Sequence, residues 1–239
     1  KRQPDSWSYI TPVDILLKYR DQTDPELFPD VDWTDEMIRK AAWSQRYNWD
    51  IRGGGNLVKY YSSLSYIYDG DVLKGQDFGQ GYIPKNDYSR FNYRINLDFT
   101  VTKTTTLSVD LDGAMGVERS TNASPTYLWQ GVYSKGPDQY PVRYKDGTFA
   151  NSKNGNLYNP VELFNFSGMT KETRMDINVS FTLNQKLDFI TKGLSFKGLV
   201  NFRNFYYSDG ANLSAVRPMT KFIDWRTGTT TWNEPDNYD

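Results

Sequence analysis

The feature that most constrains the fold is a strict alternation of apolar and polar residues between Arg90 and Val117. In RFNYRINLDFTVT, residues 90–102, nearly every second side chain is aromatic or aliphatic, and the others are polar or charged. The alternation resumes after a Thr-Lys-Thr-Thr segment, in TLSVDLDGAMGV, residues 106–117. Successive side chains of a strand point to opposite faces, so this pattern predicts two strands with one apolar face. That face packs on a core in a soluble sheet and contacts lipid in a membrane barrel.

The same period of two extends over most of the chain and predicts six strands. The expected ranges are 46–52, 57–68, 90–101, 106–117, 173–184 and 194–208. Short connections alternate with long ones, the long ones being 69–87, 118–172 and 209–239. Outer-membrane barrels sort their turns in this way, with short turns on the periplasmic side and long loops outside. Several of these strands are also about twice the usual length, which favours a membrane barrel over a soluble sandwich.

Residues 1–45 form a separate segment that precedes the strands. Four prolines interrupt it, and residues 34–43, TDEMIRKAAW, predict a short helix capped by Asp32 or Thr34. Asp35 and Glu36 fall in its first turn, where acidic groups favour the helix dipole. We therefore expect two regions, an irregular segment with a short helix at 1–45 and a partial barrel at 46–239.

Composition excludes several classes of function. The formal net charge is −1 and the basic residues are dispersed, so no nucleic acid is expected as a partner. The chain has no Cys and no His, which removes disulfides, thiolate chemistry and the commonest general base. The mean hydropathy is −0.71, and no apolar run is long enough for a membrane helix. Barrel strands escape this test because half of their residues are polar.

Three stretches of the chain carry a resemblance to a known family. They are DPELFPDVDWTDEMI at 24–38, QRYNWDIRGGGNLVKYYSSLSYIYDGD at 45–71 and YSRFNYRINLDFTVTKTTTLSV at 88–109. In order and spacing they resemble the SusC-type (SusC/RagA) family of TonB-dependent outer-membrane transporters. ITKGLSFKGLVNF, residues 190–202, fits the same family as a turn and the strand after it. The resemblance spans most of residues 24–208 and leaves out the loops at 118–172 and 209–239.

The resemblance implies the fold and the role of the chain. It implies an all-β fold, a sector of a transmembrane antiparallel β-barrel, located just after the family's plug. The plug, the TonB-contact segment and the second half of the barrel are not in this sequence, which begins at Lys1 and not at Met. We therefore expect part of a larger protein in the outer membrane of a Gram-negative bacterium. Such proteins import oligosaccharides or peptides and perform no covalent chemistry on them, so no enzyme activity and no cofactor are expected.

The implied partners follow from the same family. They are a SusD-like surface lipoprotein, the remaining barrel and plug segments of the transporter, the TonB complex acting through the plug, and outer-membrane lipid. The alternatives from other classes are a soluble β-rich carbohydrate-binding module and a carboxylate-dependent glycoside hydrolase. The hydrolase is disfavoured because no pair of acidic residues stands out.

Candidate site residues come in two groups. If the apolar face contacts lipid, the polar face lines the lumen or packs on the plug, and its predicted members are Arg90, Asn92, Arg94, Asn96, Asp98, Asp110, Asp112, Asp176, Asn178, Lys197, Asn201 and Arg203. Arg94 is expected to pair with Asp98 or Asp110. In the loop at 118–172, Tyr127, Trp129, Tyr133 and Tyr140 are candidates for stacking on a ligand or meeting a lid protein, the alternative being that they hold the fold of the loop. No metal site is expected, since DGD at 69–71 departs from the EF-hand pattern.

Overall fold

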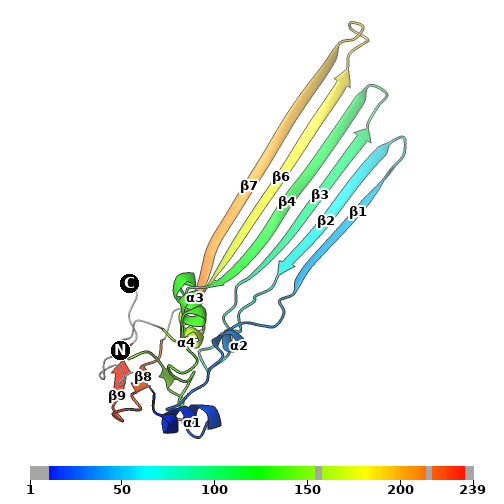
Figure 1. The fold of residues 1–239 in the computed structure, drawn as a ribbon. Coiled ribbons are helices and arrows are strands. Elements are labelled where there is room, and N and C mark those ends of the chain that lie inside the picture. The colour runs from blue at the N-terminus through cyan, green and yellow to red at the C-terminus, as the bar shows by residue number, and fades with distance from the viewer. Residues whose placement is uncertain (1–10, 154–157, 214–216, 235–239) are drawn as a thin grey trace, which may run out of the picture.

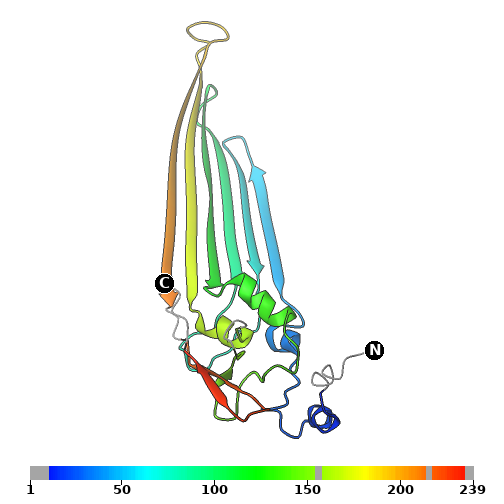
Figure 2. The same ribbon diagram turned by 60° about the vertical axis from the view of Figure 1, so that its left-hand side comes forward.

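The computed structural model describes residues 11–153, 158–213 and 217–234, and its largest element is a six-stranded sheet. All neighbouring strands are antiparallel, in the order β1-β2-β3-β4-β6-β7. The strands are β1 (Ser44–Gly54), β2 (Val58–Asp69), β3 (Asp87–Thr100), β4 (Thr105–Thr121), β6 (Met169–Lys186) and β7 (Ser195–Leu213). Figures 1 and 2 show a tall, gently curved wall with no second layer packed along most of its length.

The predicted fold class is confirmed as an antiparallel sheet with the form of a barrel sector. The six expected strands occur in order, and the three short turns meet at one end of the wall while the long connections gather at the other (Figure 1). β4, β6 and β7 extend beyond their predicted ends, to 17, 18 and 19 residues. Most of the extra length lies at the long-loop end. Polar residues such as Ser120 and Thr170 pair in the ladder there, and no alternating pattern in the sequence predicts this pairing.

The long connections fold together at that end into a compact unit, which we call the loop module (residues 11–43, 70–86, 122–153, 158–168 and 217–234). It contains the helices α1 (Val13–Asp21), α2 (Trp33–Met37), α3 (Pro125–Tyr133) and α4 (Pro160–Phe166), and a small sheet of β5 (Phe149–Ala150), β8 (Thr220–Ile223) and β9 (Thr230–Asn233). Nearly all buried apolar side chains belong to it, including Trp33, Met37, Leu128, Val161 and Phe164. The hydrophobic core of the chain therefore lies beside the sheet's end and not against its face.

The helix expected at 34–43 is shorter than predicted. Asp32 caps it as expected, accepting hydrogen bonds from the backbone N–H groups of Thr34 and Asp35 at 2.9 and 3.0 Å. It ends at Met37, however, because Ile38 turns to extended backbone and pairs with Leu73 across a β-bridge. This tertiary pairing outweighs the helical preference of the residues that follow.

Three of the four helices were not predicted. α1 lies in the segment described as irregular, and α3 and α4 lie in the loop at 118–172. α3 and α4 both begin with proline in the first turn, after Ser124 and Asn159, which is a helix-start signal. No helix in the described residues is long and apolar enough to cross a membrane.

Candidate functional site: the polar face of the sheet and the loop module

The strand register sorts the side chains of the sheet onto two faces. Arg94 lies opposite Asp112, Asp112 opposite Asn178, and Asn178 opposite Arg203, so one row of polar residues crosses four strands. Because directly opposite residues share a face, the same parity places all twelve predicted polar residues of β3, β4, β6 and β7 on one side. The structure thus brings the whole predicted set together, and its exposure to a lumen or a plug stays a prediction.

Hydrogen bonds connect the polar face across strands. The Asn178 amide donates to Asp112 Oδ1 at 3.1 Å, and the Asn201 amide donates to Asn178 Oδ1 and to Ser180 Oγ, both at 2.7 Å. Arg203 donates to both carboxylate oxygens of Asp176 from the neighbouring strand, at 3.1 and 2.5 Å. The face is therefore an ordered polar surface and not a set of independent solvated side chains.

The ion pair predicted for Arg94 is not formed. Asp98 instead accepts a hydrogen bond from Ser108 at 2.5 Å, and Arg94 lies opposite Asp112 in the ladder. Among the described residues, the cross-strand ion pair of this face is Arg203 with Asp176. Sequence spacing identified the face, but the choice of partner depends on the register between strands, which the spacing did not reveal.

The opposite face is apolar and uncovered. Trp49 and Ile51 of β1, Phe181 of β6, and Phe202 and Tyr206 of β7 lie on it and are all exposed, Phe202 by 62%. Its aromatic rings pack on one another along the strands, as Tyr47 does with Trp49 and Tyr66. Apolar surface of this extent is favourable only when something removes it from water.

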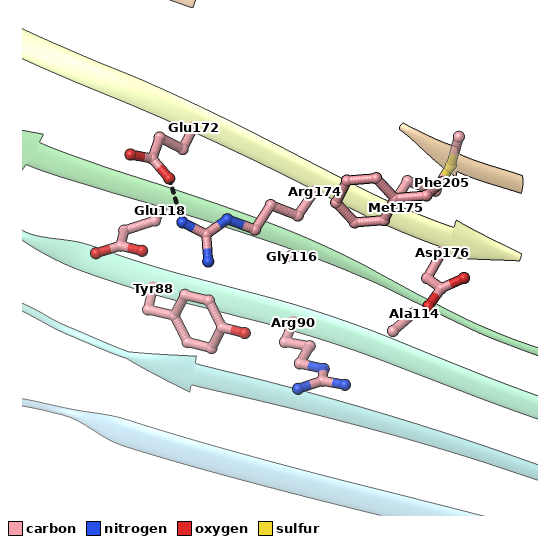
Figure 3. Close-up of a pocket in the computed structure, with 10 residues that line it drawn as sticks. All are labelled: Tyr88, Arg90, Ala114, Gly116, Glu118, Glu172, Arg174, Met175, Asp176 and Phe205. Carbon is pink, nitrogen blue, oxygen red and sulfur yellow. Dashed lines mark hydrogen bonds and ion pairs between the residues drawn. The ribbon is translucent and has the colours of Figure 1, made fainter. Parts of the chain in front are cut away.

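A hollow of about 220 Å³ opens on the polar face near the loop module, and Figure 3 shows its lining. Ala114 and Gly116 of β4 line it between Tyr88 of β3 and Phe205 of β7. Among its lining residues, Arg174 pairs with Glu172 at 2.6 Å, and Arg90 comes from β3 (Figure 3). The hollow joins a second one that shares Arg90, Ala114 and Asp176. The polar face is thus recessed beside its long-loop end and carries charges of both signs there.

Three of the four aromatic candidates in the loop lie together on α3. Trp129 and Tyr133, four residues apart, stack at 5.7 Å between ring centroids, and both are exposed. Tyr127 is also exposed and meets the edge of Tyr158. Tyr140 is different, because its side chain is 2% exposed and packs on Trp33 in the core. The expectation of an accessible Tyr140 is therefore wrong for this structure, and its ring holds the loop module together.

Buried charges in the loop module went unnoticed in the sequence. Glu162 of α4 is fully buried and receives two hydrogen bonds from Arg217, at 2.9 and 2.7 Å. Burial raises the pKa of the Glu162 carboxyl, and Arg217 opposes that effect. Lys135 lies over the rings of Trp33 and Tyr140, at 5.2 and 4.7 Å, and donates to the backbone oxygen of Tyr158. Burial lowers the pKa of Lys135 to about 7, and the nearby Glu162 opposes it.

Metal ligation finds no support in the residues described. Asp71 of the DGD turn accepts backbone hydrogen bonds from Leu73 and Asn86, at 2.8 and 2.6 Å, so its carboxylate organises the loop. No group of three acidic residues is placed to hold an ion within the part of the chain that the structure covers.

The fold and the two-faced sheet define a class, a sector of an antiparallel β-barrel. The solved structures provide a specific likeness to the RagAB peptide importer in its closed-closed state, with a TM-score of 0.51 at 17% sequence identity. The match covers 84% of this chain and 23% of the importer chain, so this chain spans less than a quarter of that protein. No protein-family model and no curated protein matches the sequence. At this sequence identity, the likeness shows a similar fold and nothing more.

Proposed function

We propose that this chain forms part of the wall of a SusC-type TonB-dependent nutrient importer in the outer membrane of a Gram-negative bacterium. The observation that carries the proposal is the uncovered apolar face of the six-stranded sheet, opposite a hydrogen-bonded polar face. Lipid removes the apolar face from water, and the polar face then lines an aqueous interior or packs on a plug. The family motifs at 24–38, 45–71 and 88–109 and the likeness to an importer support the same reading.

The two edges of the sheet require further strands. β1 and β7 each pair with one neighbour in the described structure, which leaves one side of each strand without a ladder. Unpaired backbone groups in lipid cost several kcal/mol each, by a rough general estimate. We propose that the remaining strands of the same transporter close the barrel from these edges. Residues 1–45 would then connect a preceding plug to the partial barrel at 46–239.

In this proposal the loop module lies on the outer surface. A SusD-like lipoprotein would act as its lid, and the exposed aromatic residues of α3 would contact that lid or the solute. Aromatic rings can stack on sugar rings and on peptide groups alike, so these residues fit either cargo. The resemblance favours oligosaccharides, and the neighbouring structure is a peptide importer. Energy would arrive through the plug from the TonB complex, and the solute would pass without covalent change.

The test uses the complete protein that contains this chain. Cell fractionation should place it in the outer membrane and extraction should require detergent. Loss of the protein should abolish uptake of one labelled class, oligosaccharide or peptide, and a lipoprotein should copurify with it. Recovery as a soluble monomer that binds sugar would instead identify a carbohydrate-binding module and overturn the proposal.

A further inference from the structure

The three short turns of the sheet repeat one small pattern. In each, an apolar residue is followed two positions later by lysine, and the pairs are Leu57 and Lys59, Val101 and Lys103, and Ile190 and Lys192. The apolar members are well exposed for large hydrophobic residues, at 72%, 59% and 63% in that order. All three turns lie at the same end of the wall, away from the loop module (Figures 1 and 2).

The second and third turns are closed by hydrogen bonds in which these apolar side chains take no part. In the second turn, Val101 N–H donates to the Thr105 oxygen at 3.0 Å, and the Thr102 hydroxyl accepts from Thr104 N–H at 3.2 Å. In the third, Asp188 accepts from Gly193 N–H at 2.7 Å, and Gly193 adopts a positive φ of 83°. The turns are therefore closed by their own hydrogen bonds, and the apolar side chains remain free to contact something outside the chain.

Basic residues outnumber acidic ones at this end of the wall. Three ranges form this end, namely 52–59, 99–105 and 186–197. Their basic residues are Arg52, Lys59, Lys103, Lys186, Lys192 and Lys197, and their acidic residue is Asp188. The ion pairs found in the described residues involve none of these six cations. Asp188 is occupied in its own turn. By the strand register, Arg52, Lys59, Lys186 and Lys197 lie on the polar face, and Lys59 is opposite Asp98. Of the six, Lys103 and Lys192 lie in the turns themselves and offer their charge to a partner outside the wall.

We infer that the second and third short turns, which carry Lys103 and Lys192, anchor the wall to the anionic phospholipid headgroups of the adjoining membrane leaflet. Val101 and Ile190 enter the boundary of the acyl chains, and the lysine that follows each extends along it to place its ammonium among the phosphates. The apolar face continues into the turns through exposed Leu194 and Phe196, so one lipid surface contacts both. The inference rests on the proposed function, which places the apolar face in a bilayer.

The test exploits the absence of cysteine from the chain. Three single-cysteine variants of the complete protein, Val101→Cys, Ile190→Cys and Phe181→Cys, are each labelled with an environment-sensitive fluorophore. The first two report on the turns, and the third reports on the apolar face of β6. The labelled protein is placed in nanodiscs of phosphatidylcholine alone or mixed with phosphatidylglycerol. A nitroxide-labelled phosphatidylglycerol or aqueous iodide then quenches the fluorescence.

Lipid should quench both turn probes, with a higher apparent affinity for the phosphatidylglycerol quencher than for its phosphatidylcholine equivalent. The double variant Lys103→Gln, Lys192→Gln should lower that affinity by about fivefold per lysine. A matched double variant at the other end, Lys18→Gln, Lys40→Gln, should leave it unchanged.

Two results would overturn the inference while leaving the proposed function intact. One is lipid quenching at Phe181 with iodide quenching at both turns, which would place the turns in water. The other is equal affinity of the turns for both lipids, or an unchanged affinity in the Lys103→Gln, Lys192→Gln variant. Failure of lipid to quench Phe181 would contradict the proposed function itself and remove the basis of the inference.

Discussion

Arg217 holds Glu162 through two parallel hydrogen bonds, of 2.9 Å from Nε and 2.7 Å from Nη2, in the interior of the loop module. The pair connects the segment before β8 to helix α4, 55 residues apart in the chain. Both side chains are more than nine-tenths buried. A charge in such a place is stable only while its partner remains, so this contact is the sharpest stability test in the module.

The substitution Glu162→Gln should therefore unfold the loop module more easily. It leaves the Arg217 guanidinium without its counter-charge, and removing one partner of a buried pair costs about 3–5 kcal/mol. Hydrogen exchange of peptides from α4 and β8 measures the change. The matched control is Asp176→Asn, which breaks the exposed pair with Arg203 and should leave this exchange unchanged. Equal protection in wild type and Glu162→Gln would show that the pair contributes nothing.

The second prediction concerns pH and Lys135. Its pKa is about 7 in the folded module and 10.5 as the ordinary value, so between these limits the unfolded chain binds a proton that the folded chain lacks. Stability of the module should consequently rise as the pH increases from 7 toward 10. Tyr140, whose pKa burial raises, opposes this trend only above about pH 10. Glu162 also has a raised pKa, whose contribution to stability is full below the ordinary value of 4.5 and decreases as the pH rises through the folded pKa.

Thermal melts of the loop module at successive pH values test this. The variant Lys135→Met keeps a long side chain over Trp33 and Tyr140 but cannot titrate, so its melting temperature should change less across the window. A wild-type profile that falls between pH 7 and 10, or that Lys135→Met reproduces, would contradict the assignment.

How much the sequence could predict differs between the wall and the loop module. The wall follows from a period of two that every strand repeats, and residues such as Leu97 and Asp98 fall on the faces that their type requires. The period does not specify the register between neighbouring strands. For this reason the ion pair expected for Arg94 with Asp98 or Asp110 was wrong. The strand ends beyond Val117 were also not predicted, because backbone pairing continues there without an alternation of apolar and polar residues.

The loop module depends on contacts between distant segments. α2 ends early because Ile38 pairs with Leu73, and Tyr140 is buried because Trp33 and Lys135 pack on its ring. Neither event leaves a local signal. The Pro-x-Glu start of α4 does leave one, after Asn159, whose side chain accepts from Val161 and Glu162 N–H. This capping signal in the sequence is sufficient to predict where α4 begins.

The third prediction separates the two faces of the wall. Leu97 lies on the apolar face between Tyr60 and Val109, and Asn96 lies on the polar face between Tyr61 and Asp110. If the apolar face contacts lipid, Leu97→Arg should lower barrel stability by about 2–4 kcal/mol near the midplane, and Asn96→Arg far less. The folded fraction, measured from heat-modifiable mobility on gels, compares the two variants. Equal tolerance would mean that the faces are wrongly assigned.

The fourth prediction concerns the aromatic stack on α3. If Trp129 and Tyr133 contact the lid or the solute, the double variant Trp129→Ala, Tyr133→Ala should weaken copurification of the lipoprotein or binding of the solute. Exposed aromatic hot spots at interfaces typically contribute about 2 kcal/mol or more. Substitution of Tyr140 by Phe is the control, because that ring is buried in the module. If neither copurification of the lipoprotein nor the affinity for the solute changes, the stack is a local packing feature.

The fifth prediction tests the packing of the apolar face at Gly113. A Cβ at this position would lie 2.5 Å from the Tyr93 hydroxyl oxygen and 2.5 Å from the backbone oxygen of Asp176. The ring of Tyr93 thus covers the strand where a side chain is missing, and Gly113→Ala must displace both the ring and the adjoining strand. Such overpacking costs about 1–3 kcal/mol.

Gly55 provides the control for this substitution, because nothing lies within 4 Å of a Cβ there and its φ is not positive. Gly55→Ala should leave the folded fraction unchanged in the same gel assay that reports the loss in Gly113→Ala. The double variant Gly113→Ala, Tyr93→Ser should recover part of that loss, since it removes the ring but not the contact with Asp176. Full stability in Gly113→Ala alone would show that the ring and strand move without cost, and that Tyr93 is not held over the glycine.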